Sequence, residues 1–194
     1  MPLPAPITRE LAHTRVVTCL GYQRSDQLWD IEGRIVDTKP YRFPNKDRGG
    51  HIEAEEPLHD MSIRLTIDLD LNVVDSEAVI DASPYNYCKS VSSIVKQLIG
   101  LKIAAGWTKK SKLAMGLNSG CTHLSELLGP IATTAIQTIS SARLMNPRQV
   151  RAQQSPPRSN FLNTCYALAA DSPVVKEHWP EQYRKDVKQE NKQG

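Results

Sequence analysis

The sequence of 194 residues has no long apolar run, no closely paired cysteines and few aromatic residues. Its most apolar stretch, residues 98–107, is interrupted by Lys102 and is far shorter than the about 18 apolar residues that mark a membrane helix. The first six residues, Met-Pro-Leu-Pro-Ala-Pro, have neither the basic nor the apolar region of a signal peptide. We therefore expect a cytoplasmic protein that does not interact with membranes.

Several motifs of catalysis and cofactor binding are also missing. None of the four cysteines belongs to a C-x-x-C pair, which excludes zinc-ribbon and thioredoxin-like sites and favours reduced thiols. There is no glycine-rich phosphate loop, no G-x-G-x-x-G, no G-x-S-x-G and no H-E-x-x-H. Nucleotide and dinucleotide binding are therefore disfavoured, and we expect an enzyme that uses no organic cofactor.

Acidic residues are nearly absent from the middle of the chain. Residues 82–170 hold 10 Lys/Arg and one carboxylate, Glu126, whereas residues 1–81 hold 9 Lys/Arg and 15 Asp/Glu. The basic segment either binds an anionic partner or faces the acidic segment within one fold. Its cations are dispersed and few aromatic residues lie between them, so we expect no nucleic-acid partner. A lone carboxylate in this setting makes Glu126 a candidate functional residue.

The apolar periodicity changes from that of strands to that of helices along the chain. Alternating apolar residues predict strands over 15–22, 27–38, 59–71 and 73–82. A period of about 3.6 residues predicts helices over 86–99, from Thr122 to Ile139 and over 160–170. This order indicates an α+β fold in which an antiparallel meander of about four strands is followed by helices packed on one face.

The domain organisation follows from the same pattern. We expect a single α+β domain over residues 13–170, with a strand-rich part at 13–82 and a helical part at 84–170. Residues 39–57, which are rich in proline and glycine, are predicted to form a long loop. Pro130 should kink or briefly break the long helix. Residues 184–194 have the composition of a disordered tail.

The strongest chemical signal is the segment 120–127, Gly-Cys-Thr-His-Leu-Ser-Glu-Leu, which follows a glycine-rich turn and opens the long helix. The positive end of the helix dipole favours a thiolate at Cys121 and a neutral imidazole at His123. Glu126 lies three residues after His123 and shares its helix face. Such a pair suits acid–base catalysis or metal binding. The alternative is a helix cap in which Glu126 merely satisfies His123.

A second candidate group lies at the start of the strand over 59–71. His59 has the phase of the apolar face, so we expect it to point into the core or to a pocket rim, whereas Asp60 and Arg64 share the opposite face. Arg64, which is flanked by carboxylates, forms either a cross-strand ion pair or a contact for a substrate carboxylate.

Glu32, Gly33 and Arg34 in the middle of the second strand form a third group, together with Asp37 further along the hairpin. Gly33 marks a bulge, a close approach by a ligand, or room for a large neighbouring side chain. The charges beside it are either a solvated face or contacts for a substrate. Trp107 is favoured as a core residue and is retained as a candidate contact for an aromatic substrate.

Three segments carry a resemblance to a known family: residues 31–37, residues 59–68 with the sequence His-Asp-Met-Ser-Ile-Arg-Leu-Thr-Ile-Asp, and residues 120–128 with Gly-Cys-Thr-His-Leu. Together they resemble an uncharacterised domain family of bacteria, mainly proteobacteria, that is catalogued as a domain of unknown function. The resemblance covers about residues 13–145. Its members accompany genes for the breakdown of aromatic and acyl compounds, which implies a small-molecule enzyme rather than a nucleic-acid binder.

The leading hypothesis is an acid–base lyase that cleaves a C–C bond of a small anionic or phenolic compound. One version is a retro-aldol loss of formaldehyde from a lignin-derived phenolic dimer. His123 would be the general base, Glu126 would orient it or act as acid, and His59 would be a second proton-transfer group. Cys121 lies in the same cluster, and Arg64 would hold negative charge.

Two alternatives remain open at this point. The first is a metal-dependent lyase or hydrolase, because His59, His123 and Glu126 offer ligands suited to zinc or iron, with Cys121 beside them. The second is a non-catalytic binding or assembly module, in which the same residues build the fold. The sequence is also compatible with a homo-oligomer.

Overall fold

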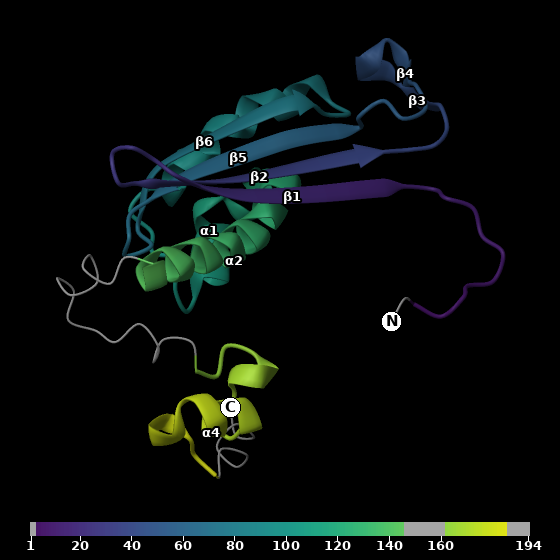
Figure 1. Cartoon of the computed structure of the whole chain (residues 1–194). Helices are drawn as coiled ribbons and strands as arrows, with labels where there is room; N and C mark the ends of the chain where they lie inside the picture. The colour runs from purple at the N-terminus through teal and green to yellow at the C-terminus, as the bar shows by residue number, and fades with distance from the viewer. Residues whose placement is uncertain (1–2, 146–161, 186–194) are drawn as a thin grey trace. The chain divides into compact units, whose positions relative to one another are not determined.

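The computed structural model describes residues 3–145 and 162–185 of the chain (Figure 1). The chain divides into two compact units, Met1–Ser141 and Ala142–Gly194. The predicted domain over 13–170 includes residues of both units, and its outer boundary stays a prediction. Residues 186–194 of the predicted tail lie outside the described part of the chain. No helix among the described residues is long and apolar enough to cross a bilayer.

The first unit is built on a four-stranded antiparallel sheet with the strand order β1-β2-β5-β6. The strands are β1 (Thr14–Gln23), β2 (Trp29–Thr38), β5 (His59–Ile67) and β6 (Val73–Ala82). The predicted α+β class and the four-stranded meander are confirmed. β5 ends four residues earlier than expected because Asp68 accepts hydrogen bonds from the backbone N–H groups of Asp70 and Asn72 and turns the chain.

Residues 39–57 are not simply a loop, so this prediction is wrong in part. They contain a two-stranded sheet, β3 (Phe43–Asn45) and β4 (Gly50–Ile52), joined by the 3-10 helix η1 (Lys46–Arg48). Asn45 caps η1 by accepting a hydrogen bond from the backbone N–H of Arg48, and Gly49 takes the left-handed conformation that ends it. Strands of three residues are too short for alternation to be recognised in a sequence.

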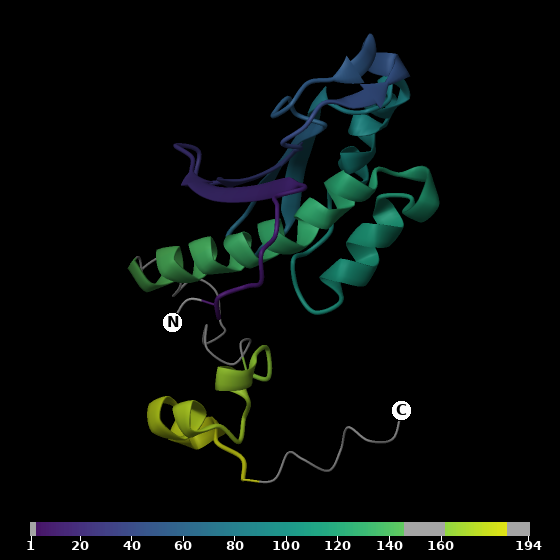
Figure 2. The same cartoon turned by 90° about the vertical axis from the view of Figure 1, so that its right-hand side faces the viewer.

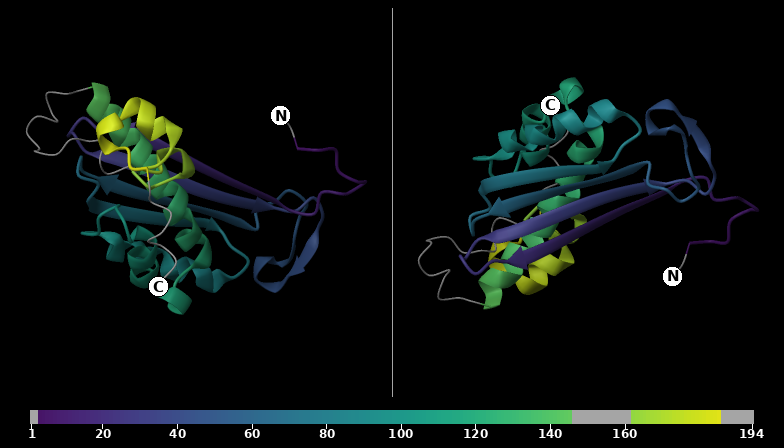
Figure 3. Two further views of the ribbon diagram at one scale, coloured as in Figure 1. Left: turned by 90° about the horizontal axis from the view of Figure 1, so that it is seen from below. Right: turned by 90° about the horizontal axis from the view of Figure 1, so that it is seen from above.

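The core lies between one face of the sheet and helix α2 (Thr122–Met145), which crosses that face (Figure 2). Figure 3 shows α2 in front of the strands from one side and the strands in front of α2 from the other. A Cβ atom at Gly33 would come within 2.6 Å of the Ile131 side chain, so this glycine makes room for a large neighbour. Of the three interpretations of Gly33, the structure supports this one. The completely buried apolar residues of β2, β5 and α2 include Ile31, Leu65, Leu124, Leu127 and Ile131.

The helices differ in part from the predicted ones. The segment predicted over 86–99 is the 3-10 helix η2 (Asn86–Leu98), in which the hydroxyls of Ser90 and Ser92 donate to carbonyls three residues earlier. It is followed by α1 (Trp107–Ala114) and the 3-10 helix η3 (Leu117–Ser119). α2 runs through Pro130 as one helix, so no break is present there.

The second unit contains a short 3-10 helix, η5 (Tyr166–Leu168), where a longer apolar helix was predicted over 160–170. Two further short helices follow it, α4 (Pro173–His178) and η6 (Pro180–Gln182). Asn163 has a positive φ of 60°, and its side chain accepts a hydrogen bond from the backbone N–H of Ala170. This turn folds residues 163–170 back on themselves, which is incompatible with a continuous helix.

Candidate active site

A buried carboxylate, Asp37, is the centre of a cluster of charged and titratable side chains. It lies near the end of β2, on the core-facing side, and its side chain has no exposed surface. The antiparallel register places it directly between Arg15 of β1 and His59 of β5. Arg15 donates to both carboxylate oxygens, from Nε to Oδ1 at 2.7 Å and from Nη2 to Oδ2 at 2.8 Å. Such a bidentate pair fixes the orientation of the carboxylate.

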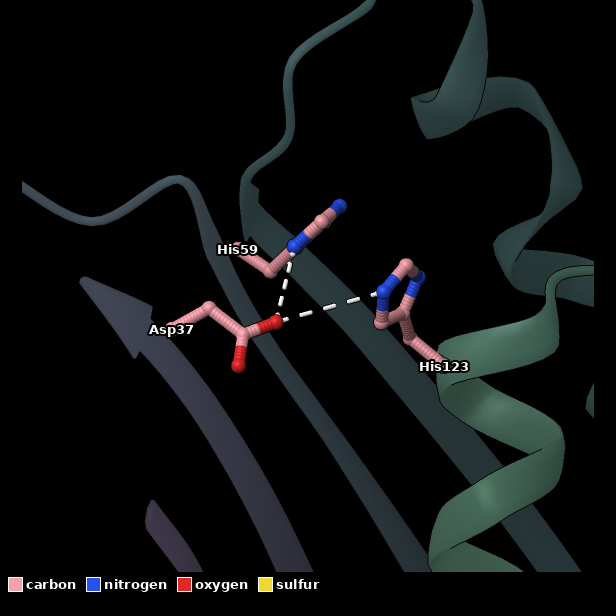
Figure 4. Close-up of side chains that lie close together, drawn as sticks. All are labelled: Asp37, His59 and His123. Atoms are coloured by element: carbon pink, nitrogen blue, oxygen red, sulfur yellow. Dashed lines mark hydrogen bonds and ion pairs between the residues drawn. The ribbon is translucent and has the colours of Figure 1, made fainter. Parts of the chain in front are cut away.

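His59 makes a second contact with Asp37, over 2.9 Å between its Nδ1 and Oδ2 (Figure 4). The pKa of Asp37 is about 2: burial would raise it, but the hydrogen bonds and charge of Arg15, helped by His59 and His13, outweigh burial. Asp37 is therefore ionised at neutral pH and can only accept. His59 must then carry its proton on Nδ1, which leaves Nε2 with a free lone pair when the ring is neutral.

His123, the second residue of α2, lies against His59. The two ring centroids are 3.7 Å apart and the rings are tilted by 31°. Its Nε2 is 3.9 Å from Asp37 Oδ2, too far for a hydrogen bond but within the range of an ion pair. Figure 4 shows both imidazoles approaching the carboxylate, His59 from the sheet and His123 from the helix. Two imidazoles thus lie within ion-pair distance of one carboxylate.

Both imidazoles prefer the neutral form. Burial lowers the pKa of His59, and the neighbouring His123 lowers it further, against the opposing effect of Asp37. Burial also lowers the pKa of His123, followed by the positive charge of Arg15. Neutral imidazoles that lie side by side next to a fixed carboxylate can accept a proton from a bound molecule at neutral pH.

Two more residues complete the cluster. Arg15 Nη1 donates to Glu126 Oε2 at 2.6 Å, so the guanidinium bridges Asp37 and the first turns of α2. His13 Nε2 lies 3.2 Å from Asp37 Oδ1, from the residue just before β1. Three of the five histidines of the chain therefore surround one carboxylate.

The structure brings together His59 and His123 of the predicted catalytic residues and places the other two beside them. Glu126 accepts from Arg15, and the carboxylate within ion-pair distance of both imidazoles is Asp37. Cys121 lies one residue before α2, where its Sγ contacts Met61 Sδ at 3.8 Å. The carboxylate partner predicted for His123 is thus replaced by one from the sheet.

The five predicted substrate-binding residues do not join this cluster. Trp107 is packed in the core, and its Nε1 donates to the backbone carbonyl of Leu128 at 3.0 Å. The other four lie on the opposite face of the sheet, as alternation along β2 and β5 requires. There Arg34 pairs with Asp60, and Arg64 pairs with Glu32.

That outer face has a hollow of about 510 Å³ over the middle of the four strands. Glu32, Arg34 and Arg64 line it, but each of them is engaged in an ion pair with a neighbouring strand. The cross-strand ion pair, one of the two interpretations of Arg64, is the arrangement observed. In Figure 3, no described helix of the first unit covers this face of the sheet.

Asp37 belongs to the third group of candidates but was given no catalytic role from the sequence, and Arg15 and His13 were not among the candidates. Asp37 has the strand phase of Ile31 and Ile35, and a charged residue at a core-facing position is the signal that could have identified it. Arg15 shares this face on β1, but pairing it with Asp37 requires the register. His13 precedes the strand and has no periodicity to reveal it.

The geometry of Asp37, His59 and His123 suits hydrogen bonding and proton transfer better than it suits metal coordination. Asp37, His59 and His123 each offer one possible ligand atom, and these three atoms lie within 4.8 Å of one another. Donors bound to one zinc ion are about 3 to 3.6 Å apart, so His123 Nε2, at 3.9 Å from Oδ2, would have to approach. The rings would also have to unstack, and Asp37 Oδ2 already accepts from Arg15 and His59. Glu126, which was predicted as a metal ligand, is not one of these three residues.

Comparison with known proteins identifies a family but no function. Residues 13–137 match the model of a family described as "protein of unknown function (DUF2889)". Neither a curated protein nor a solved structure matches the chain. Because the match covers most of the chain, the protein belongs to the DUF2889 family, in agreement with the resemblance to an uncharacterised domain family.

Proposed function

We propose that the protein is an acid–base lyase in which His59 and His123 move a proton on a small phenolic or anionic substrate. The observation that carries the proposal is the buried contact of Asp37 with His59, together with the His59–His123 stack at 3.7 Å. An ionised carboxylate that fixes the tautomer of one imidazole is the arrangement by which general bases are oriented. The side chains of His59 and His123 are 11% and 25% exposed, which leaves them within reach of a bound molecule.

The roles of the residues follow from their contacts. His59 is assigned as the general base because Asp37 orients it, whereas the sequence alone favoured His123. His123 is the second proton-transfer group. Glu126 does not orient His123 directly, since its carboxylate is taken up by Arg15.

The reaction that suits this pair best is a retro-aldol loss of formaldehyde. His59 takes the proton of a primary hydroxyl, the C–O bond becomes a double bond, and the C–C bond breaks. The electron pair remains on a carbon next to an aromatic ring, and that carbon takes up the proton from the imidazole pair. Protons and electrons balance without an oxidant or an organic cofactor. The choice of a phenolic dimer as substrate rests on the association with aromatic-compound breakdown that the family resemblance implies.

The proposal is tested by incubating the full chain with phenolic dimers that carry a hydroxymethyl group and measuring formaldehyde. His59→Ala should lower turnover by about 10²- to 10⁴-fold, the contribution of an oriented base. His51→Ala is the matched control, because His51 lies on β4 and pairs with the exposed Glu53. If His59→Ala kept turnover of a substrate of the wild-type protein within a few-fold, the proposal would be wrong.

A metal-dependent lyase or hydrolase is the second candidate, favoured by the convergence of Asp37, His59 and His123. It differs from the first in one measurable respect. Protein purified without chelators would contain about one equivalent of zinc or iron per chain, and His123→Ala would lose it. A metal content far below one equivalent, with turnover unchanged by chelators, would leave the acid–base mechanism.

A further inference from the structure

The two imidazoles of the site belong to different layers of the fold. His59 is the first residue of β5, and His123 is the second residue of α2. Their spacing therefore depends on how the first turn of α2 lies over the end of the sheet. Apolar contacts from Leu124 and Leu127 hold the helix on the sheet, but such contacts are non-directional and do not by themselves set its rotation.

One chain of ion pairs joins the two layers at this end. Arg15 of β1 uses Nε and Nη2 for Asp37 of β2 and Nη1 for Glu126 of α2, with distances of 2.6 to 2.8 Å. The guanidinium is planar, so its three engaged nitrogens fix the directions of both carboxylates. Glu126 lies less than one turn from His123, on the same face of the helix.

Helix α2 lacks one internal hydrogen bond near its start. The backbone carbonyl of Glu126 would accept a hydrogen bond from residue 130, but Pro130 has no N–H. The first turn of α2 is therefore tied to the next by one bond fewer than usual. The contact of Glu126 with Arg15 acts at the residue whose carbonyl lacks this bond.

We propose that Glu126 is a positioning residue, which holds the first turn of α2 through Arg15 and thereby sets the spacing between His59 and His123. That this spacing matters for turnover rests on the proposed function. That Glu126 sets the spacing does not. Glu126 is half exposed, so an ordinary surface ion pair at this place would add little to stability. Loss of this contact should therefore change the spacing between His59 and His123 more clearly than it changes the melting temperature.

The test is an NMR measurement of the nuclear Overhauser effect between the ring protons of His59 and His123 in protein labelled at histidine. This effect falls steeply with distance, and stacked rings should give a strong cross-peak. We expect Glu126→Gln to weaken the cross-peak several-fold and to leave the melting temperature nearly unchanged. Arg15→Lys, which keeps the charge but loses the fork, should weaken it as well.

Glu77→Gln is the matched control, because Glu77 pairs with Arg64 over 3.3 Å at similar exposure on the other face of the sheet. It should leave the cross-peak unchanged. An unchanged cross-peak in Glu126→Gln, or a large fall in its melting temperature, would overturn the inference. Neither result involves a substrate, so both are distinct from a failure of the lyase assay, which would leave this spacing role intact.

Discussion

The two faces of one sheet carry the same kind of ion pair in different surroundings. On the core-facing side, Arg15 makes a bidentate pair with Asp37 at 2.7 and 2.8 Å. On the outer side, Arg34 makes a bidentate pair with Asp60 at 2.7 and 2.5 Å. The geometry of the two pairs is nearly the same, so geometry does not distinguish a site from an ordinary cross-strand pair.

What differs is the number and the kind of groups around each carboxylate. Asp37 has no exposed surface and is shared by a guanidinium and two histidines within hydrogen-bond distance. Asp60 is 11% exposed and accepts from Arg34, whose side chain is 57% exposed. The hollow of the outer face is lined by paired charges and contains no histidine. A buried charge with titratable neighbours therefore marks the candidate site better than the outer hollow does.

The largest expected effect is on the core-facing carboxylate. Asp37→Ala removes the acceptor of Arg15 and His59, and a broken buried pair typically costs about 3 to 5 kcal/mol. Because Arg15 is partly exposed and can turn to water, we expect the lower end, about 3 kcal/mol, in the free energy of unfolding measured with urea. Asp60→Ala on the outer face should cost clearly less. Equal losses in the two variants would erase the distinction between the faces.

The sheet was predictable because its strands alternate. β5 and β6 place apolar residues on one face, as in Met61, Ile63 and Leu65. This pattern predicted the start of β5, both ends of β6 and their antiparallel order. The elements that were missed have no readable period. β3 and β4 have three residues each, and η2 has the apolar stripe of an α-helix but the hydrogen bonding of a 3-10 helix.

The candidate site was only half predictable. His59 and His123 were chosen from local signals, a core-facing strand position and a helix start. Asp37 also has a core-facing strand position, but its role as their partner depends on register: it stands opposite both Arg15 and His59. A pair within one helix, such as His123 and Glu126, is visible in a sequence, whereas a pair across strands is not.

The second expected effect is a pH dependence that belongs to the core-facing cluster alone. Asp37 has a pKa of about 2 when folded and 3.8 in its ordinary state, so its stabilisation is present above pH 4 and is lost as the pH falls towards 2. This loss amounts to about 2 kcal/mol. The lowered pKa values of His59 and His123 act in the same sense: their contribution is present above about pH 6.5 and declines below it.

Urea unfolding at a series of pH values resolves the two steps. Asp37→Asn should remove the step near pH 3, and the double variant His59→Gln and His123→Gln should remove the one below pH 6.5. Glu32→Gln, on the outer face, should keep both. A wild-type protein whose stability did not change between pH 7 and 5 would contradict the preference of the two imidazoles for the neutral form.

The smallest expected effect is on the outer face itself. Glu32 is 37% exposed and Arg64 is 46% exposed, so their ion pair is screened by water and salt. Glu32→Gln should change the free energy of unfolding by about 1 kcal/mol or less, and less still at high salt. Arg64→Gln should keep turnover within a few-fold of wild type in the formaldehyde assay. A loss in Arg64→Gln as large as that in His59→Ala would place the substrate in the outer hollow, because Arg64 contacts Glu32 and Glu77 on that face of the sheet.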